Sequence, residues 1–168
     1  MYKSLVLIIV AVLAQLNLSA QEWKVAKGAQ VPFFSVENKE GKKITTVDLK
    51  GKIVLLNFFA TWCGPCRQEL PRLQKELWDT LGKRSDFEIM VLAREEGWDK
   101  LDPFMKNNNY TFPVFPDLNR KVFSLFADQS IPRNVLLNKE GKIIYQSIGY
   151  TPEEFSALVS LIKEELKK

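Results

Sequence analysis

The chain has no histidine, and Cys63 and Cys66 are its only cysteines. A structural zinc site needs four ligands, usually cysteine or histidine, and this chain offers too few of either. Attachment of c-type haem requires a histidine directly after the second cysteine of a Cys-x-x-Cys motif, but Arg67 stands there. The sequence therefore predicts neither a zinc site nor a covalently attached haem.

An apolar run long enough to span a bilayer comfortably, about 20 residues, is also missing. The run near the N-terminus, residues 5–14, follows Lys3 and precedes a small residue, Ala20. A positive start, a short apolar core and a small residue at the cleavage point are typical of a secretory signal. We predict a signal peptide over residues 1–20 and an exported domain over 21–168, with an uncleaved membrane anchor as the alternative.

A large excess of one sign of charge is absent as well. The 24 basic and 20 acidic residues give a net charge of +4, and they are interspersed. This pattern does not favour nucleic-acid binding, which typically requires a basic stripe or patch. The length of 168 residues and the 46% hydrophobic content fit one globular domain with a full core. We expect a monomer.

The two cysteines stand in the segment Trp62-Cys63-Gly64-Pro65-Cys66, between an apolar strand and a helix. A disulfide between them closes a small ring, which restrains the unfolded chain little and makes a poor structural crosslink. The spacing therefore favours a redox centre over an inert disulfide. Export would place this pair where a disulfide can persist.

The predicted helix makes the two thiols unequal. Cys63 falls at its N-terminus, where unpaired backbone N–H groups favour a thiolate. Cys66 lies one turn further along and should be more buried. Cys63 is thus the expected nucleophile, and Cys66 is the resolving thiol that releases the partner.

Apolar periodicity predicts an α/β fold in which a central mixed sheet has helices on both faces and an N-terminal β-hairpin. Ile53–Phe59 is almost continuously apolar, as in a strand buried on both sides. Leucines at helical spacing predict a helix over 63–81, kinked by Pro71 and ended by Gly82. The other predicted elements are hairpin strands 31–37 and 42–47, strands 87–93, 133–138 and 142–148, and helices 98–109, 119–126 and 151–167.

The stretch from Ala60 to Pro71, ATWCGPCRQELP, resembles the active site of the thioredoxin superfamily, and most of all its exported TlpA/ResA branch. The resemblance extends from Val31 to the last helix. It implies a thioredoxin-like fold and a thiol–disulfide oxidoreductase without a metal or organic cofactor. Asn57, where thioredoxin usually has Asp, and Glu69, three residues after Cys66, both fit the exported branch.

The same resemblance assigns the partner-binding surface. It implies a cis proline at Pro132, opposite the cysteines, with the backbone at Ile131 pairing with the bound partner. Trp62, Gly64 and Pro65 would border the same surface. Arg133 stands where the family often has Thr, and we expect it to place a cation near the site.

Glu69 is expected on the same helix face as Cys66. Its carboxylate could exchange a proton with Cys66 or raise the pKa of that thiol by repulsion; the alternative is a solvated acid beside Arg67 and Lys75. The resemblance favours a functional role. The Arg94-Glu95-Glu96 segment follows a predicted strand and could line the end of the sheet, although such a segment is more often just a polar loop.

By resemblance, the chain is a periplasmic reductase that receives electrons from a membrane donor. Its expected substrates are exported proteins with cysteines, apo-cytochrome c among them. One alternative is a peroxide reductase of the peroxiredoxin type, although Thr61 lies two residues before Cys63 instead of the three that its motif requires. Another is a non-catalytic module that binds partners between Trp62 and Pro132. The sequence does not determine the direction of electron flow.

Overall fold

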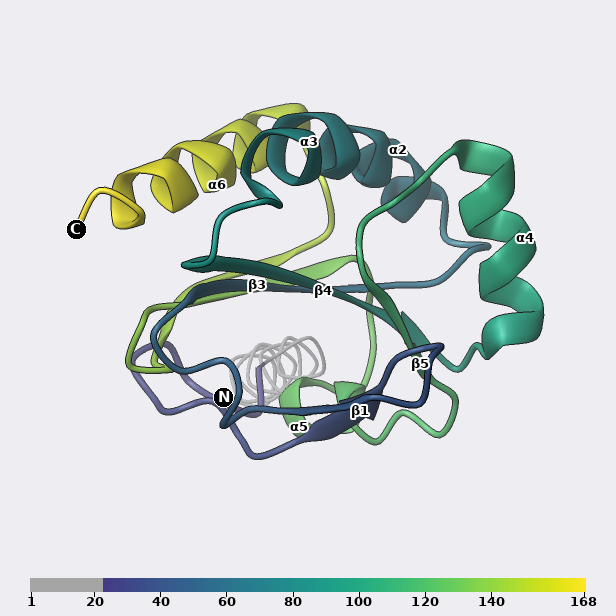
Figure 1. Ribbon diagram of the computed structural model, residues 1–168, viewed down its shortest axis with the longest axis horizontal. Coiled ribbons are helices and arrows are strands. Elements are labelled where there is room, and N and C mark those ends of the chain that lie inside the picture. The colour runs from purple at the N-terminus through teal and green to yellow at the C-terminus, as the bar shows by residue number, and fades with distance from the viewer. Residues whose placement is uncertain (1–22) are drawn as a thin grey trace, which may run out of the picture.

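The computed structural model describes residues 23–168, so the predicted signal peptide lies outside the described residues. Its main sheet contains β3 (Ile53–Phe59), β4 (Phe87–Arg94), β5 (Val114–Asp117), β6 (Arg133–Leu137) and β7 (Ile143–Ile148). The strand order is β5-β4-β3-β6-β7 (Figure 1). β3, β4 and β5 run parallel, whereas β6 is antiparallel to both β3 and β7. The sheet is therefore mixed, as predicted.

Helices and a hairpin cover the two faces of this sheet. One face carries α2 (Gly64–Arg72), η2 (Leu73–Trp78), α3 (Asp79–Leu81), α4 (Trp98–Asn108) and α6 (Pro152–Glu165). The opposite face carries α5 (Phe123–Phe126) and the hairpin of β1 (Ser35–Glu37) and β2 (Lys43–Thr45) (Figure 1). The predicted N-terminal hairpin is present, with shorter strands than expected.

The central strand β3 separates two hydrophobic clusters. Leu55 and Phe59 belong to the cluster beneath α2 and α6, whereas Leu56 and Phe58 belong to the cluster beside α5 and the hairpin. Successive side chains of a strand point to opposite faces. Asn57 therefore lies on the α2 side, at a position that would otherwise hold an apolar residue.

The irregularity expected at Pro71 takes the form of the π-helical segment η2, which begins two residues later. Proline lacks the N–H that would bond to a carbonyl four residues earlier, and its ring crowds that carbonyl; a locally widened helix is one response. The helical stretch ends before Gly82, as predicted. A Cβ at Gly82 would lie 2.5 Å from the Trp78 side chain, so this close approach requires glycine.

The sequence analysis missed strand β5 and predicted α5 too long. Pro116 lies within β5, and proline argues against a central strand because it cannot donate to the ladder. β5 is an edge strand, where proline is tolerated. The predicted helix 119–126 is reduced to Phe123–Phe126.

The N-terminal residues of the described chain run beside the other edge of the sheet. Gly28 N–H donates to the Ile143 carbonyl at 2.8 Å, and Ile143 N–H donates to the Ala29 carbonyl at 2.9 Å. Gln30 forms an antiparallel bridge with Lys142. Within residues 23–168, no helix is long and apolar enough to cross a membrane.

Candidate active site

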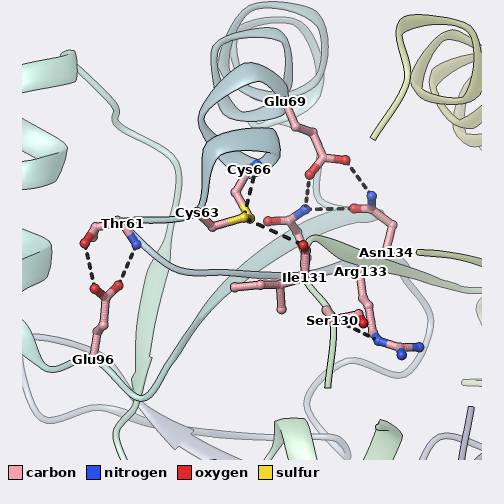
Figure 2. Close-up of a disulfide and its surroundings, with 10 residues drawn as sticks. Thr61, Cys63, Cys66, Glu69, Glu96, Ser130, Ile131, Arg133 and Asn134 are labelled. Carbon is pink, nitrogen blue, oxygen red and sulfur yellow. Dashed lines mark hydrogen bonds between the residues drawn. A yellow bond between two sulfur atoms is a disulfide. The ribbon is translucent and has the colours of Figure 1, made fainter. Parts of the chain in front are cut away.

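The two cysteines form a disulfide at the N-terminus of α2, just beyond the end of β3 (Figure 2). Cys63 caps the helix, and the backbone N–H of Cys66 points to its sulfur at 3.3 Å. Cys63 is 5% exposed and Cys66 is fully buried. The pair therefore has the asymmetry that the sequence predicts, with Cys63 nearer to solvent and to the helix N-terminus.

The bond between Ile131 and Pro132 is cis, as the family resemblance implied. The Ile131 carbonyl oxygen lies 3.7 Å from the Cys63 sulfur, so this loop faces the disulfide (Figure 2). A groove of about 360 Å³ opens here, with residues 62–65 on one side and Arg94, Ser130 and Ile131 on the other. Trp62 is 65% exposed at its border. The predicted partner-binding residues are thus brought together around Cys63.

Glu69 is not a solvated acid beside Arg67 and Lys75, because only 1% of it is exposed. Its two carboxylate oxygens accept hydrogen bonds from the side-chain amides of Asn57, at 2.9 Å, and Asn134, at 2.6 Å (Figure 2). Burial raises the pKa of Glu69 to about 7, although both hydrogen bonds favour the charged form. A carboxyl that titrates near neutral pH therefore lies one helical turn after Cys66.

Asn134, which the sequence analysis did not single out, completes this network. The Nδ2 group of Asn57 also donates to its Oδ1 at 2.9 Å, and the two asparagines are paired across β3 and β6. Within residues 23–168, Oδ1 of Asn57 has no hydrogen-bond partner. An amide directly before three apolar residues of the predicted strand, and two residues after Pro132, was the available signal.

Of the two interpretations of the Arg94-Glu95-Glu96 segment, the structure supports the one that lines the end of the sheet, because β4 ends at Arg94 and Glu96 is buried. Glu96 is 7% exposed, and its carboxylate accepts hydrogen bonds from the Thr61 backbone N–H at 2.7 Å and hydroxyl at 2.6 Å (Figure 2). These bonds tie the turn after β4 to the loop that carries Cys63. The threonine two residues before the nucleophile was the only sequence signal.

Arg133 does not place a cation in the groove. Asn134 and Arg133 are successive residues of β6, so they point to opposite faces, and Arg133 is fully buried. Its Nε donates to the carbonyls of Gln129, at 3.1 Å, and Ser130, at 3.0 Å, and its guanidinium lies 4.5 Å from the ring centre of Trp23. Arg133 therefore supports the cis-proline loop from the far face of the sheet.

The chain matches known proteins in both sequence and structure. The model of the AhpC/TSA family matches residues 27–146. The thiol-disulfide oxidoreductase ResA of a Bacillus cereus strain is 36% identical over 135 residues, covering 80% of this chain and 77% of that protein. ResA of Bacillus subtilis (strain 168) is 35% identical over 129 residues, covering 77% and 71%.

Solved structures of similar fold agree with these sequence matches. A Bacteroides thetaiotaomicron protein, proposed to be a protein disulfide isomerase, superposes with a TM-score of 0.84 and 36% identity over 89% of this chain and 95% of that one. A thiol:disulfide interchange protein of the thioredoxin family from Chlorobium tepidum TLS gives 0.70 and 26%, over 84% and 99%. The chain therefore belongs to the AhpC/TSA family of thioredoxin-like proteins and is a thiol–disulfide oxidoreductase.

Proposed function

We propose that this protein works outside the cytoplasm as a reductase of disulfides in exported proteins. The observation that carries this proposal is the unequal cysteine pair, with Cys63 at the helix N-terminus facing an open groove and Cys66 buried behind it. The Gly-Pro dipeptide between the cysteines, which resembles that of the reductant thioredoxin, supports the reducing direction. The signal-like N-terminal sequence supports export.

In the proposed reaction, the thiolate of reduced Cys63 attacks one sulfur of the partner disulfide. A mixed disulfide forms, and the other partner sulfur leaves as a thiolate. The thiolate of Cys66 then attacks the Cys63 sulfur and displaces the second partner sulfur. Two electrons pass to the partner, which takes up two protons, while Cys63 and Cys66 lose theirs and form the disulfide. The electrons reside in the cysteine pair, so the reaction requires no metal or organic cofactor.

Glu69 has the proposed role of exchanging a proton with Cys66 during this reaction. Burial brings the pKa of Glu69 to about 7, and proton exchange is most efficient when the pKa of the group lies near the working pH. With this pKa, the Glu69 carboxyl can hold a proton in one redox state of the cysteine pair and release it in the other. Asn57 and Asn134 fix its orientation.

The partners that we propose are exported proteins with cysteines, and apo-cytochrome c is one candidate. Trp62, Gly64, Pro65 and the Ile131-Pro132 backbone would bind the partner chain, since they border the groove or the loop that faces Cys63. A membrane donor would return electrons to the pair. A monomer can perform all of these steps.

Redox titration of the pair against glutathione tests the proposed direction. We expect a reduction potential near that of thioredoxin, about −270 mV; a strongly oxidising value would contradict the reductase assignment. Trapping with Cys66→Ser, which cannot resolve the mixed disulfide, should recover exported partners, and Cys63→Ser is its control.

Two experiments separate the alternatives. A peroxidase assay tests the peroxide reductase, and we expect it to show no cysteine-dependent turnover of peroxide. A binding module without catalysis would retain full activity when both cysteines are replaced by serine, whereas the proposed oxidoreductase would lose it.

A further inference from the structure

We infer that Arg94 makes the groove selective for substrate chains that carry an acidic residue next to the reactive cysteine. This inference rests on the proposed reduction of protein disulfides and specifies its substrates. Arg94 is the only charged residue among those that line the groove within the described part of the chain. Its side chain is 17% exposed, which leaves it accessible from the groove.

Arg94 belongs to a cluster of charged side chains at the ends of β4 and β5. Its Nε lies 3.1 Å from the Glu95 carboxylate, and Arg120 approaches the same carboxylate at 3.9 Å. Two cations therefore share one anion. Two further acids nearby, Glu96 and Asp117, accept hydrogen bonds from neutral donors and do not line the groove. Neither Arg94 nor Arg120 makes a hydrogen bond through Nε within residues 23–168.

The cluster is held in place by an aromatic ring and by the backbone. The guanidinium groups of Arg94 and Arg120 lie 5.0 and 5.4 Å from the ring centre of Phe123. Glu95 and Arg120 both have left-handed backbone conformations, with φ of 63° and 55°. Their N–H groups donate to the same carbonyl, that of Asp117, at 3.0 and 2.9 Å.

This conformation is unfavourable for residues with side chains, and it persists where the surroundings determine it, often at ligand-binding sites. The charges at the ends of β4 and β5 are therefore presented in a fixed arrangement. A guanidinium that is already oriented loses less conformational freedom when it binds a carboxylate.

The chemistry of the groove selects an acidic peptide segment as the occupant. Trp62 and Ile131 supply apolar borders, and such borders strengthen the effect of a charge by excluding water. A chain whose cysteine is bonded to Cys63 must place its neighbouring residues along this groove. A carboxylate there can accept charge-assisted hydrogen bonds from Arg94, the charged residue of the groove lining, whereas a lysine would be repelled by it.

Three synthetic peptides that differ only in the residue after a single cysteine (Asp, Asn or Lys) provide the test. Each cysteine is joined in a disulfide to 2-mercaptoethanol, and reduction by the pre-reduced protein is followed under single-turnover conditions. We expect the order Asp, Asn, Lys, with the Asp peptide about fivefold faster than the Lys peptide at low ionic strength. The difference should diminish as salt is added, because salt screens exposed charges.

Variants assign the effect to Arg94. Arg94→Gln should reduce the three peptides at equal rates, and Arg94→Lys should keep the order with a smaller difference. Arg84→Gln is the matched control, since Arg84 also pairs with a carboxylate, that of Asp86, but precedes β4 at the opposite end of that strand. It should retain the wild-type order.

Equal rates for the three peptides with the wild-type protein would overturn the inference, as would an unchanged order in Arg94→Gln. If Arg94→Gln fails to fold, two other measurements still test the inference. The difference between the Asp and Lys peptides must diminish with salt in the wild type, and it must be smaller in Arg94→Lys. Failure of the wild type to reduce any of the peptides would overturn the proposed function, and the inference with it.

Discussion

The amide nitrogen of Asn57 lies 2.9 Å from the carboxylate of Glu69, in a site that is closed to solvent. Asn57 is neutral, and so is the second donor, Asn134. Hydrogen bonds from neutral amides favour the charged carboxylate, but they do not balance the cost of burying it. The pKa of Glu69 therefore rises to about 7, which makes the stability of the protein depend on pH.

The first prediction concerns the pH dependence of stability. The pKa of Glu69 is raised from 4.5 to about 7 on folding, so in this interval the unfolded chain has lost a proton that the folded protein still holds. The stability that this proton contributes is complete below pH 4.5 and is lost as the pH rises through 7. The contribution of Glu69 to the unfolding free energy should fall by about 3 kcal/mol across the interval.

Chemical denaturation of the oxidised protein at several pH values measures this slope. Glu69→Gln should remove it. Glu76→Gln is the control within the same helical stretch: the hydrogen bond from Arg72 lowers the pKa of Glu76, so its contribution has the opposite sign and appears at lower pH. Identical slopes in wild type and Glu69→Gln would contradict the assignment.

A second carboxyl beside Glu69 should make stability strongly dependent on pH. In Asn57→Asp, the new carboxyl replaces an amide 2.9 Å from the Glu69 oxygen, and two acids this close share a proton. We expect the variant to lose roughly 2 kcal/mol more unfolding free energy at pH 8 than at pH 5, relative to wild type. Urea midpoints at both pH values measure this, and Asn107→Asp on the exposed side of α4 should show no such loss.

Glu96→Gln should loosen the loop that carries Cys63. The change removes the charge from two hydrogen bonds to Thr61 and leaves one acceptor oxygen for two donors. We expect a loss of about 1–3 kcal/mol in unfolding free energy and slower attack by Cys63 on a peptide disulfide. Thermal unfolding and stopped-flow exchange measure the two effects. Asp99→Asn, at an exposed position at the start of α4, should match wild type in both.

Trp23→Ala should weaken binding of protein substrates without changing the intrinsic reactivity of the disulfide. Arg133, which holds the carbonyls of Gln129 and Ser130, packs on the Trp23 ring. We expect a higher KM for a protein disulfide, because we propose that such a partner binds along the loop at Ile131, and a loss of about 1 kcal/mol in stability.

Reduction of the oxidised protein by dithiothreitol should proceed at the wild-type rate, since this small reductant does not need the loop. The exposed residue Lys27 provides the control variant Lys27→Ala. An unchanged KM in Trp23→Ala would show that Arg133 has a structural role alone.

Local sequence patterns predicted those parts of the structure that depend on residues close together in the sequence. The apolar run of β3 has the predicted bounds. The helix predicted over 151–167 is α6, which begins at Pro152 with the Thr151 hydroxyl accepting from the Glu154 N–H. The Cys-x-x-Cys spacing and the start of the helix predicted the unequal thiols for the same reason.

The remaining features depend on how distant segments pair. Asn134 contacts Glu69 only because β6 pairs with β3 in the register that places Asn134 opposite Asn57. A shift of one residue would exchange it with Arg133, which points to the other face. Glu96 likewise reaches Thr61 across 35 residues of sequence, and no local pattern indicates such a contact.

The edges of the sheet are shielded in a way that suits the proposed binding of partner chains at the loop beside Cys63. Pro116 removes a backbone donor from β5, and residues 28–30 occupy the free side of β7 at Ile143. An exposed strand edge can template pairing with another polypeptide and begin aggregation. With both edges obstructed, an unfolded client has less opportunity to bind along the sheet, so productive encounters are biased toward the end that carries Cys63.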